Sequence, residues 1–126
     1  MTAQHLNLGR RAEELAVVHV KKLGWRLLAR NFSCKLGELD IAALDEKEKE
    51  LVMVEVRCRT QNSVQAPEDS IGPRKLRTLI GAGRVFVDKT GWTGPWRIDL
   101  FAVTAFPCEP ETRWRLEHLP NITQQQ

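Results

Sequence analysis

Two neighbouring apolar segments of the chain carry polar residues at alternate positions. Asp40 lies within Glu38-Leu-Asp-Ile-Ala-Ala-Leu44, whereas Glu55 and Arg57 lie within Leu51-Val-Met-Val-Glu-Val-Arg57. Two carboxylates near a cation can hold a divalent metal ion beside a phosphate group. The residue types therefore indicate a metal site of the kind that hydrolyses phosphodiesters, provided that the fold brings these side chains together.

The two segments predict the strands of a β-hairpin with a polar turn between them. A register that centres the turn pairs Asp40 with Glu55 and Glu38 with Arg57. Opposed residues of antiparallel strands point to the same face, so one face carries these four polar side chains at one end. The other face is apolar and must be core; it carries Leu39, Ile41, Ala43, Val52, Val54 and Val56.

This register places the Asp40 and Glu55 carboxylates opposite each other, with Cβ atoms about 4.5–5.5 Å apart, which destabilises like charges. A shared proton, a neighbouring cation such as Arg57, or a divalent metal would each offset the repulsion. A structural interpretation also stays open, in which Glu38, Arg57 and their neighbours form a cross-strand ion-pair ladder on a solvated face.

The pattern of the whole chain predicts an α/β domain of order αβββαββ, with a central mixed β-sheet and flanking helices. On the first helix, Glu13 falls on the shoulder of the apolar stripe. Residues 1–122 are expected to form one domain and residues 123–126 a disordered tail. The expected elements are a helix at 8–23, strands at 25–32, 38–44 and 51–57, a helix opening at 72–73, and strands at 96–104 and 113–119.

The net charge of +3 conceals an uneven distribution. Residues 1–35 carry a net charge of +5, residues 36–56 carry −5, and residues 57–97 again carry +5. Basic flanks around an acidic segment suit a nucleic-acid partner, because they can hold a phosphate backbone beside a metal. No apolar run approaches the roughly 18 residues that cross a bilayer, so no membrane partner is expected and the cytoplasm is the expected location.

Short motifs also follow one another in order from about residue 9 to residue 103. They are Gly9-Arg-Arg-Ala-Glu13-Glu-Leu-Ala16, Arg30-Asn31, Gly37-Glu-Leu-Asp40, Val54-Glu55-Val-Arg57-Cys-Arg59, Lys75 and Arg97-Ile-Asp99. Together they resemble the bacterial YraN family, which is similar to archaeal Holliday junction resolvases and has the PD-(D/E)xK nuclease pattern. The resemblance implies a restriction-endonuclease-like fold and a metal-dependent endonuclease acting on branched or structured DNA.

The resemblance also implies roles for individual residues. Glu13, Asp40, Glu55 and Arg57 match the catalytic positions, and Glu13, Asp40 and Glu55 are the expected ligands of Mg²⁺ or Mn²⁺. Because junction resolvases work as dimers, a homodimer is a further expectation. No Walker loop or GxGxxG motif is present, so no nucleotide cofactor is expected.

Two positions differ from the family pattern: Ala12 replaces the usual glycine before the helix glutamate, and Arg57 replaces lysine. Lysine can lose its proton when buried, whereas arginine effectively cannot. If the basic residue accepts a proton, Arg57 is inert; if it stabilises charge on the phosphate, Arg57 can serve. The alternative function is therefore a nucleic-acid-binding module on the same fold without catalytic activity.

Basic residues outside the hairpin supply the expected nucleic-acid contacts. Two of them fall in the first turn of the second helix, where free backbone N–H groups favour anions. On the third long apolar segment, Arg97 and Asp99 alternate and predict a structural ion pair. The expected nucleic-acid-binding residues are Arg10, Arg11, Arg59, Arg74 and Lys75.

Overall fold

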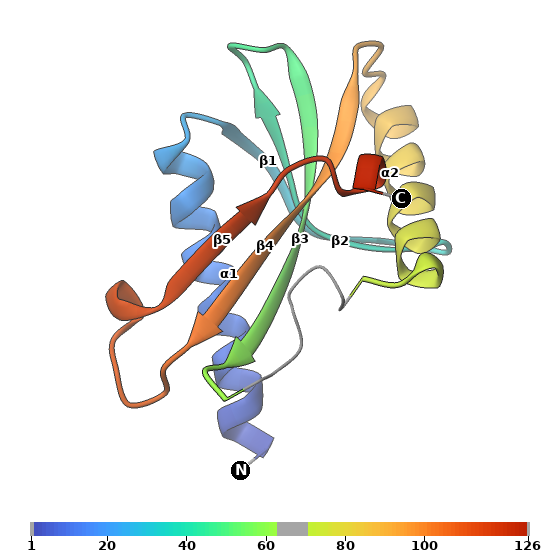
Figure 1. Ribbon diagram of the computed structural model, residues 1–126. Coiled ribbons are helices and arrows are strands. Elements are labelled where there is room, and N and C mark those ends of the chain that lie inside the picture. Colours follow the sequence, from blue (N-terminus) through green and yellow to red (C-terminus); the bar gives the residue numbers. More distant parts are fainter. Residues whose placement is uncertain (1, 63–70, 126) are drawn as a thin grey trace.

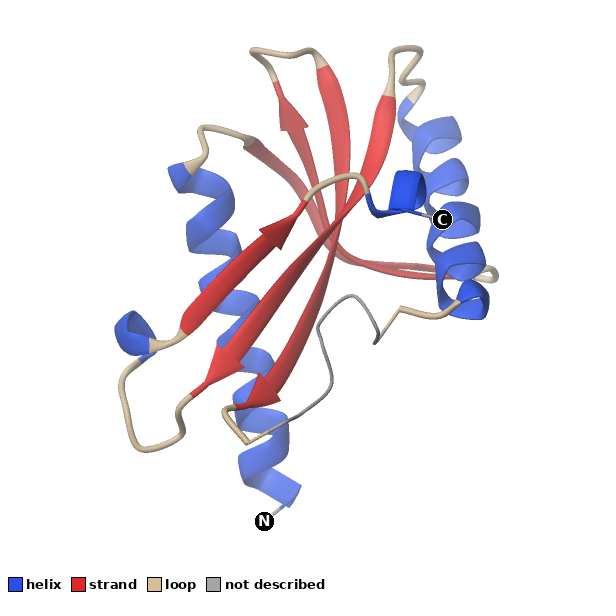
Figure 2. Cartoon of the chain, viewed as in Figure 1, coloured by secondary structure: helices blue, strands red, loops and turns tan. Residues whose placement is uncertain are grey.

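A computed structural model describes residues 2–62 and 71–125 of the chain, with side chains described for 8–62 and 71–123. The two helices lie on opposite faces of one central sheet (Figure 1 and Figure 2), which confirms the predicted α/β class and the order αβββαββ. The elements are α1 (Thr2–Lys22), β1 (Arg26–Cys34), β2 (Gly37–Asp45), β3 (Glu50–Thr60), α2 (Pro73–Thr90), β4 (Trp96–Ala105) and β5 (Arg115–Leu119), with short 3₁₀ helices η2 (Glu111–Arg113) and η3 (Ile122–Gln125).

The five strands follow one another across the sheet in the order β1-β2-β3-β4-β5. Neighbouring strands are antiparallel except β3 and β4, which are parallel. A parallel pair needs a long crossover, and the chain between β3 and β4 supplies it with α2 (Figure 1). This crossover is what brings the first turn of α2 close to β3.

Each helix covers one apolar face of the sheet. The hairpin register is confirmed where the strands pair, for example by Ala42 opposite Met53, so alternate residues enter opposite layers. Leu39 is an exception to the predicted faces, because it packs on the α2 side. The α2 layer contains Leu39, Ala42, Leu51, Met53, Leu76, Leu79, Phe86, Ile98 and Leu100. The α1 layer contains Ala16, Val20, Trp25, Ile41, Ala43, Val52, Val54, Phe101 and Val103.

Backbone signals at both ends of α2 explain its length. Pro73 stands at the first helical position, where its missing N–H costs nothing, and the Leu76 N–H bonds to the Gly72 carbonyl oxygen. Gly91 ends the helix in the left-handed conformation, with a φ of 72° and an N–H that donates to the Val87 carbonyl oxygen. The first turn carries no acidic residue.

Close packing at Gly83 joins α2 to β4. A Cβ atom at this position would lie 2.5 Å from Cζ3 of Trp96. Gly83→Ala is therefore expected to lower the free energy of unfolding by about 1–3 kcal/mol, because the indole must move within a packed layer. Urea denaturation measures this loss.

Gly9→Ala is the matched control, since Gly9 also lies in a helix but a Cβ there meets nothing within 4 Å. Its stability is expected to stay the same or rise by up to about 1 kcal/mol. Equal effects of the two substitutions would contradict the packing argument.

Some predicted boundaries differ from the structure. The first helix begins at Thr2 instead of residue 8, so Gly9 lies inside it. Residues 123–125 of the predicted tail belong to η3, and Ile122 at the start of η3 is buried against the α2 layer. Residue 126 of the predicted tail and residues 63–70 lie outside the described residues.

Candidate functional site

The central feature of the site is a fork between β2 and β3. Their paired ladder ends at Ile41 opposite Val54. Beyond this point β2 remains paired with β1 and β3 remains paired with β4. Figure 1 shows β1 and β2 curving away from the other strands toward the first turn of α2. Asp40 and Glu55 are the next residues of the two strands, so they lie at the fork.

Asp40 is held by the backbone of the strand that it faces. Its Oδ2 accepts a hydrogen bond of 2.8 Å from the Val56 N–H. This bond satisfies a strand N–H that the departure of β2 would leave without a ladder partner. The predicted pairing of Glu38 with Arg57 is wrong, because β2 has already left β3 and Glu38 lies opposite Ser33 of β1.

Glu55 is a buried acid between two cations. Its side chain is 6% exposed, and its Oε2 lies 3.1 Å from Nε of Arg57 and 3.6 Å from Nζ of Lys75. Burial, and next the charge of Asp40, raise the pKa of Glu55 to about 7, although Lys75 and Arg57 act in the opposite direction. Without a further cation, this carboxyl is therefore half protonated near neutral pH.

The contact between Arg57 and Glu55 is an ion pair without a hydrogen bond. Nε of Arg57 is buried and has no hydrogen-bond partner within the described residues, although it lies within ion-pair distance of the Glu55 carboxylate. The N–H is therefore not directed at the carboxylate oxygen. A buried donor without a partner is unusual, and such groups recur at functional sites.

Glu13 of α1 acts on the same site electrostatically. Burial and then the charge of Asp40 raise the pKa of Glu13. However, no group of three or more Asp, Glu, His or Cys residues in the described part of the chain is placed to hold a metal ion. The structure thus brings together Asp40 and Glu55, and the role of Glu13 as a third metal ligand stays a prediction.

Two adjacent carboxylates fit one class of metal better than another. Mg²⁺ binds one or two carboxylates and keeps several waters, whereas a structural zinc site needs four protein ligands. The Asp40–Glu55 pair matches the first requirement. Burial, and next the charge of Asp40, raise the pKa of Glu55, and a divalent cation would offset both effects. The donor set therefore fits Mg²⁺ or Mn²⁺.

Asp99 on the neighbouring strand shows what a satisfied buried carboxylate looks like here. Its side chain is 0% exposed, and Arg97 donates to it from Nε at 2.9 Å, which confirms the predicted ion pair. His118 Nε2 lies 2.7 Å from Oδ2, and the Asn121 N–H donates to Oδ1 at 2.8 Å. Burial raises the pKa of Asp99, but the bonds from His118 and Arg97 outweigh it, and the net pKa is lowered.

Two buried acids of one sheet thus differ in character. Asp99 accepts hydrogen bonds that stabilise its ionised carboxylate, as expected of a residue with a structural role. Glu55 is held in an environment that opposes its charge. A carboxyl whose pKa is raised by burial and a neighbouring charge is typical of a functional site, so Glu55 is the stronger candidate for a catalytic role.

The basic residues predicted to contact nucleic acid do not gather at one place. Lys75 reaches the fork, and Arg74 is exposed in the same helical turn. Arg11 instead forms an ion pair with Glu111, and its guanidinium carbon lies 4.5 Å from the centre of the Trp114 ring. Arg11 therefore has a structural role that ties η2 to α1.

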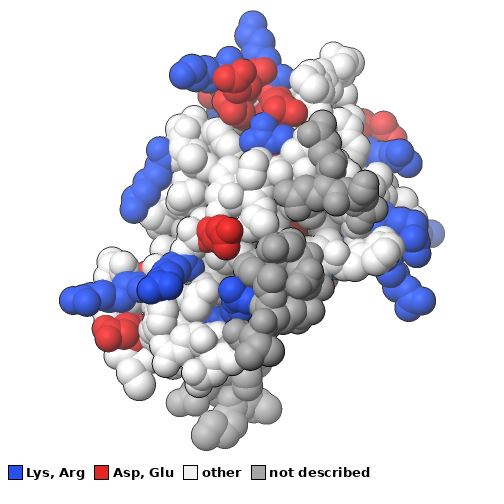
Figure 3. All heavy atoms as spheres, in the orientation of Figure 1, with Lys and Arg blue, Asp and Glu red and all other residues white. Residues whose placement is uncertain are grey.

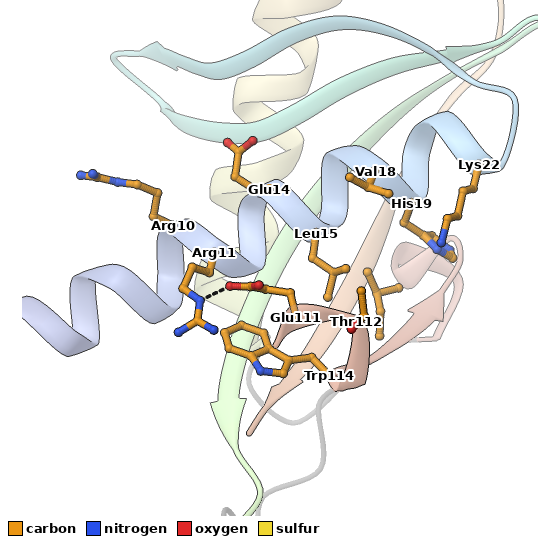
Figure 4. A pocket seen from close by; sticks show the side chains of 11 residues that line it. Arg10, Arg11, Glu14, Leu15, Val18, His19, Lys22, Glu111, Thr112 and Trp114 are labelled. Atoms are coloured by element: carbon orange, nitrogen blue, oxygen red, sulfur yellow. Dashed lines mark hydrogen bonds and ion pairs between the residues drawn. The ribbon is translucent and has the colours of Figure 1, made fainter. Parts of the chain in front are cut away.

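Arg10 and Arg11 line a pocket of about 620 Å³ between α1 and the η2–β5 segment (Figure 4). Leu15, Val18 and Trp114 form apolar parts of its wall. None of the residues at the fork lines this pocket. It opens on the other flank of α1 from Glu13, so it is separate from the carboxylate pair.

The acidic segment found in the sequence is also divided by the fold. Asp45, Glu46, Glu48 and Glu50 lie at the turn end of the hairpin, about 17 Å along the strand from Asp40. Figure 3 shows one face of the molecule, on which Lys and Arg atoms lie in separate groups instead of one continuous patch. The charge pattern by itself therefore does not mark the site.

The raised pKa of Glu55 predicts how the metal-free protein responds to pH. The folded state holds the proton up to about pH 7, whereas the unfolded chain loses it near 4.5. The contribution of the Glu55 carboxyl to the free energy of unfolding is therefore fully present below about pH 4.5 and is lost as the pH rises through 7. From pH 5 to pH 8, the wild type is expected to lose about 2 kcal/mol relative to Glu55→Gln, measured by urea denaturation. Parallel pH curves for the two proteins would contradict the assignment.

The sequence did not predict several residues that contact Glu55 and Asp99 and shift their pKa values. It did not anticipate that Lys75 contacts Glu55, or that His118 and Asn121 complete the shell of Asp99. These contacts join residues about 20 positions apart. No local pattern reports such contacts, because they depend on how the crossover and the last strand pack.

The fold and site define an α/β/α domain with a carboxylate pair where its mixed sheet divides. Residues 12–103 match the model of the Uncharacterised protein family UPF0102, and the chain belongs to this family, which confirms the predicted YraN resemblance. The chain is 40% identical over 108 residues to a UPF0102 protein of Stutzerimonas stutzeri, covering 84% of this chain and 88% of that protein. It is 36% identical over 114 residues to a UPF0102 protein of Nitrosococcus oceani, with 89% and 90% covered. A UPF0102 protein of Pelotomaculum thermopropionicum is 40% identical over 115 residues, with 90% and 92% covered.

Within the described residues, no helix has the length and apolar character needed to span a membrane.

Proposed function

We propose that this protein is a divalent-metal-dependent endonuclease that hydrolyses phosphodiester bonds of branched or otherwise structured DNA. The observation that carries the proposal is buried Glu55 beside Asp40 at the fork of the sheet, with the cations of Arg57 and Lys75 next to it. The resemblance of the sequence motifs to restriction-endonuclease-like proteins supports the same proposal. A homodimer belongs to the same proposal, since junction resolvases work as dimers.

The chemistry divides between the metal and the side chains. Asp40 and Glu55 would hold Mg²⁺ or Mn²⁺, which lowers the pKa of a bound water and offsets charge on phosphate when it is present. Asp40 is oriented for this by the Val56 N–H. Burial of Glu55 keeps bulk water away from one side of the pair. Arg57 contributes fixed positive charge where negative charge grows on the phosphate.

Isothermal titration calorimetry with Mn²⁺, followed by incubation with a labelled four-way DNA junction, tests the proposal. The wild-type protein is expected to bind Mn²⁺ and to cut the junction in a metal-dependent manner. An unbranched duplex of the same sequence measures the preference for branched DNA. No binding by the native protein at millimolar Mn²⁺, with or without DNA, would remove the basis of the proposal and favour a purely structural ion-pair cluster.

Arg57 favours a second candidate, a nucleic-acid-binding module on the same fold that does not cut. Arginine cannot accept a proton, and Nε of Arg57 lies within ion-pair distance of Glu55. Arg57→Lys separates the two candidates. A large gain in cutting would mean that arginine disables the site, whereas equal or weaker cutting supports an active native enzyme. Salt dependence of junction binding then measures how many phosphates either protein contacts.

A further inference from the structure

Lys75 reaches the carboxylate pair from a different element than Arg57. Its Nζ lies 3.6 Å from Oε2 of Glu55, and its side chain is 35% exposed. The helix begins at Pro73, so Lys75 belongs to its first turn. Side chains on a helix lean toward its N-terminus, and those of the first turn extend past the helix end. This geometry directs the ammonium at the fork while leaving part of it open to solvent.

The two cations contact Glu55 with different parts of their side chains. Arg57 approaches with Nε, the nitrogen nearest its own backbone, and this atom is buried. Its strand is fixed by the parallel ladder, in which Arg57 lies opposite Ala102. Lys75 approaches with the terminal ammonium of a flexible four-carbon chain. The Arg57 side chain is 38% exposed, but the atom that contacts Glu55 is close to the strand backbone, whereas the terminal ammonium of Lys75 can move from the carboxylate to a ligand without disturbing the sheet.

We propose that Lys75 is a catalytic residue whose ammonium contacts the scissile phosphate during bond cleavage, in addition to the fixed positive charge that Arg57 supplies beside Glu55. This inference rests on the proposed nuclease function. A phosphate drawn to the Asp40–Glu55 pair comes within reach of a cation that already ends there. Lys75, which the sequence assigned to nucleic-acid binding, thus acts on the rate of the reaction.

In the reaction, a water oxygen bonds to phosphorus and the ester P–O bond breaks, with its electron pair passing to the leaving oxygen. The water releases a proton to solvent, and the leaving oxygen takes one up, so that phosphodiester and water give phosphomonoester and alcohol. Lys75 takes no part in these proton transfers. Its positive charge offsets the negative charge that gathers on the non-bridging oxygens as the new bond forms.

The test compares the wild type with Lys75→Met at pH 8 in three measurements. They are single-turnover cleavage of a labelled four-way junction in Mn²⁺, junction affinity by fluorescence anisotropy, and Mn²⁺ affinity by calorimetry. Lys75→Met is expected to cut about 100-fold more slowly, with junction affinity within about threefold of the wild type. Mn²⁺ is expected to bind at least as tightly, because a neighbouring positive charge has been removed.

Lys89→Met is the matched control, since Lys89 lies in the last turn of the same helix, about 21 Å along its axis from Lys75. It is expected to cut within about twofold of the wild type, as a change distant from the reacting atoms should. Thermal unfolding of both variants shows whether each is folded at the assay temperature. Lys75→Arg keeps the charge with a different shape and is expected to cut faster than Lys75→Met.

Two results would overturn the role of Lys75 alone. One is cutting by Lys75→Met at the wild-type rate, and the other is a loss of junction affinity as large as the loss of rate, which would make Lys75 a binding residue. A wild-type protein that binds Mn²⁺ but cuts none of the substrates overturns the nuclease function and the role of Lys75 together. The wild-type rate therefore distinguishes the two failures.

Discussion

Glu55→Gln is expected to lower the affinity for Mn²⁺ by about 100-fold or more and to reduce junction cleavage by about 1000-fold or more. The amide keeps the shape of the side chain but removes the charge that binds the metal. Glu55 is buried beside Asp40, and no other carboxylate completes a group of three within the described residues. Calorimetry and single-turnover kinetics at pH 8 measure the two losses.

Stability separates this loss of metal binding from a loss of structure. Burial and the charge of Asp40 oppose ionisation of Glu55, so Glu55→Gln is expected to keep or raise the stability of the metal-free protein at pH 8. Glu46→Gln is the matched control, because Glu46 is exposed in the hairpin turn and pairs loosely with Arg26 at 3.8 Å. Metal binding by Glu55→Gln equal to that of Glu46→Gln would contradict the site.

Asp99→Ala is expected to lower the free energy of unfolding by about 3–5 kcal/mol, because truncation breaks a buried ion pair and leaves its partner charged. Arg97 would keep Glu50, 2.6 Å away, but would lose two bonds to Asp99. The Asn121 N–H, which donates to Asp99, would lose its acceptor. The loss is expected to loosen the β4–β5 edge of the sheet, and urea denaturation measures its size.

Asp88→Ala is the control for Asp99, since Asp88 is exposed on α2. Its effect on the free energy of unfolding is expected to stay within about 0.5 kcal/mol. Asp99→Ala is also expected to leave Mn²⁺ binding intact in the folded fraction, because Asp99 packs on the α1 side and Glu55 contacts Lys75 of α2. A stability loss below about 1 kcal/mol would show that the ion pair is not structural.

Much of the fold was predictable because it follows from local alternation. Strand residues alternate between two faces, so the apolar pattern determined the hairpin register that pairs Ala42 with Met53. The Arg97–Asp99 pair was predictable for the same reason, as the two residues share one face of one strand. The C-terminal boundary of the secondary structure was not predictable, because Ile122 at the start of η3 is buried by contacts with residues far away in the sequence.

The sequence by itself determined which acids stand at the end of the hairpin and the order of the elements around them. The tertiary structure decided their chemistry. Only the parting of β2 from β3 turns Asp40 toward the Val56 N–H, and only the crossover through α2 brings Lys75 to Glu55. It also pairs Arg11, one of the expected nucleic-acid contacts, with Glu111 of η2. The physical reason is that charge and burial act through space, so the pKa of a carboxyl depends on neighbours that lie far away along the chain.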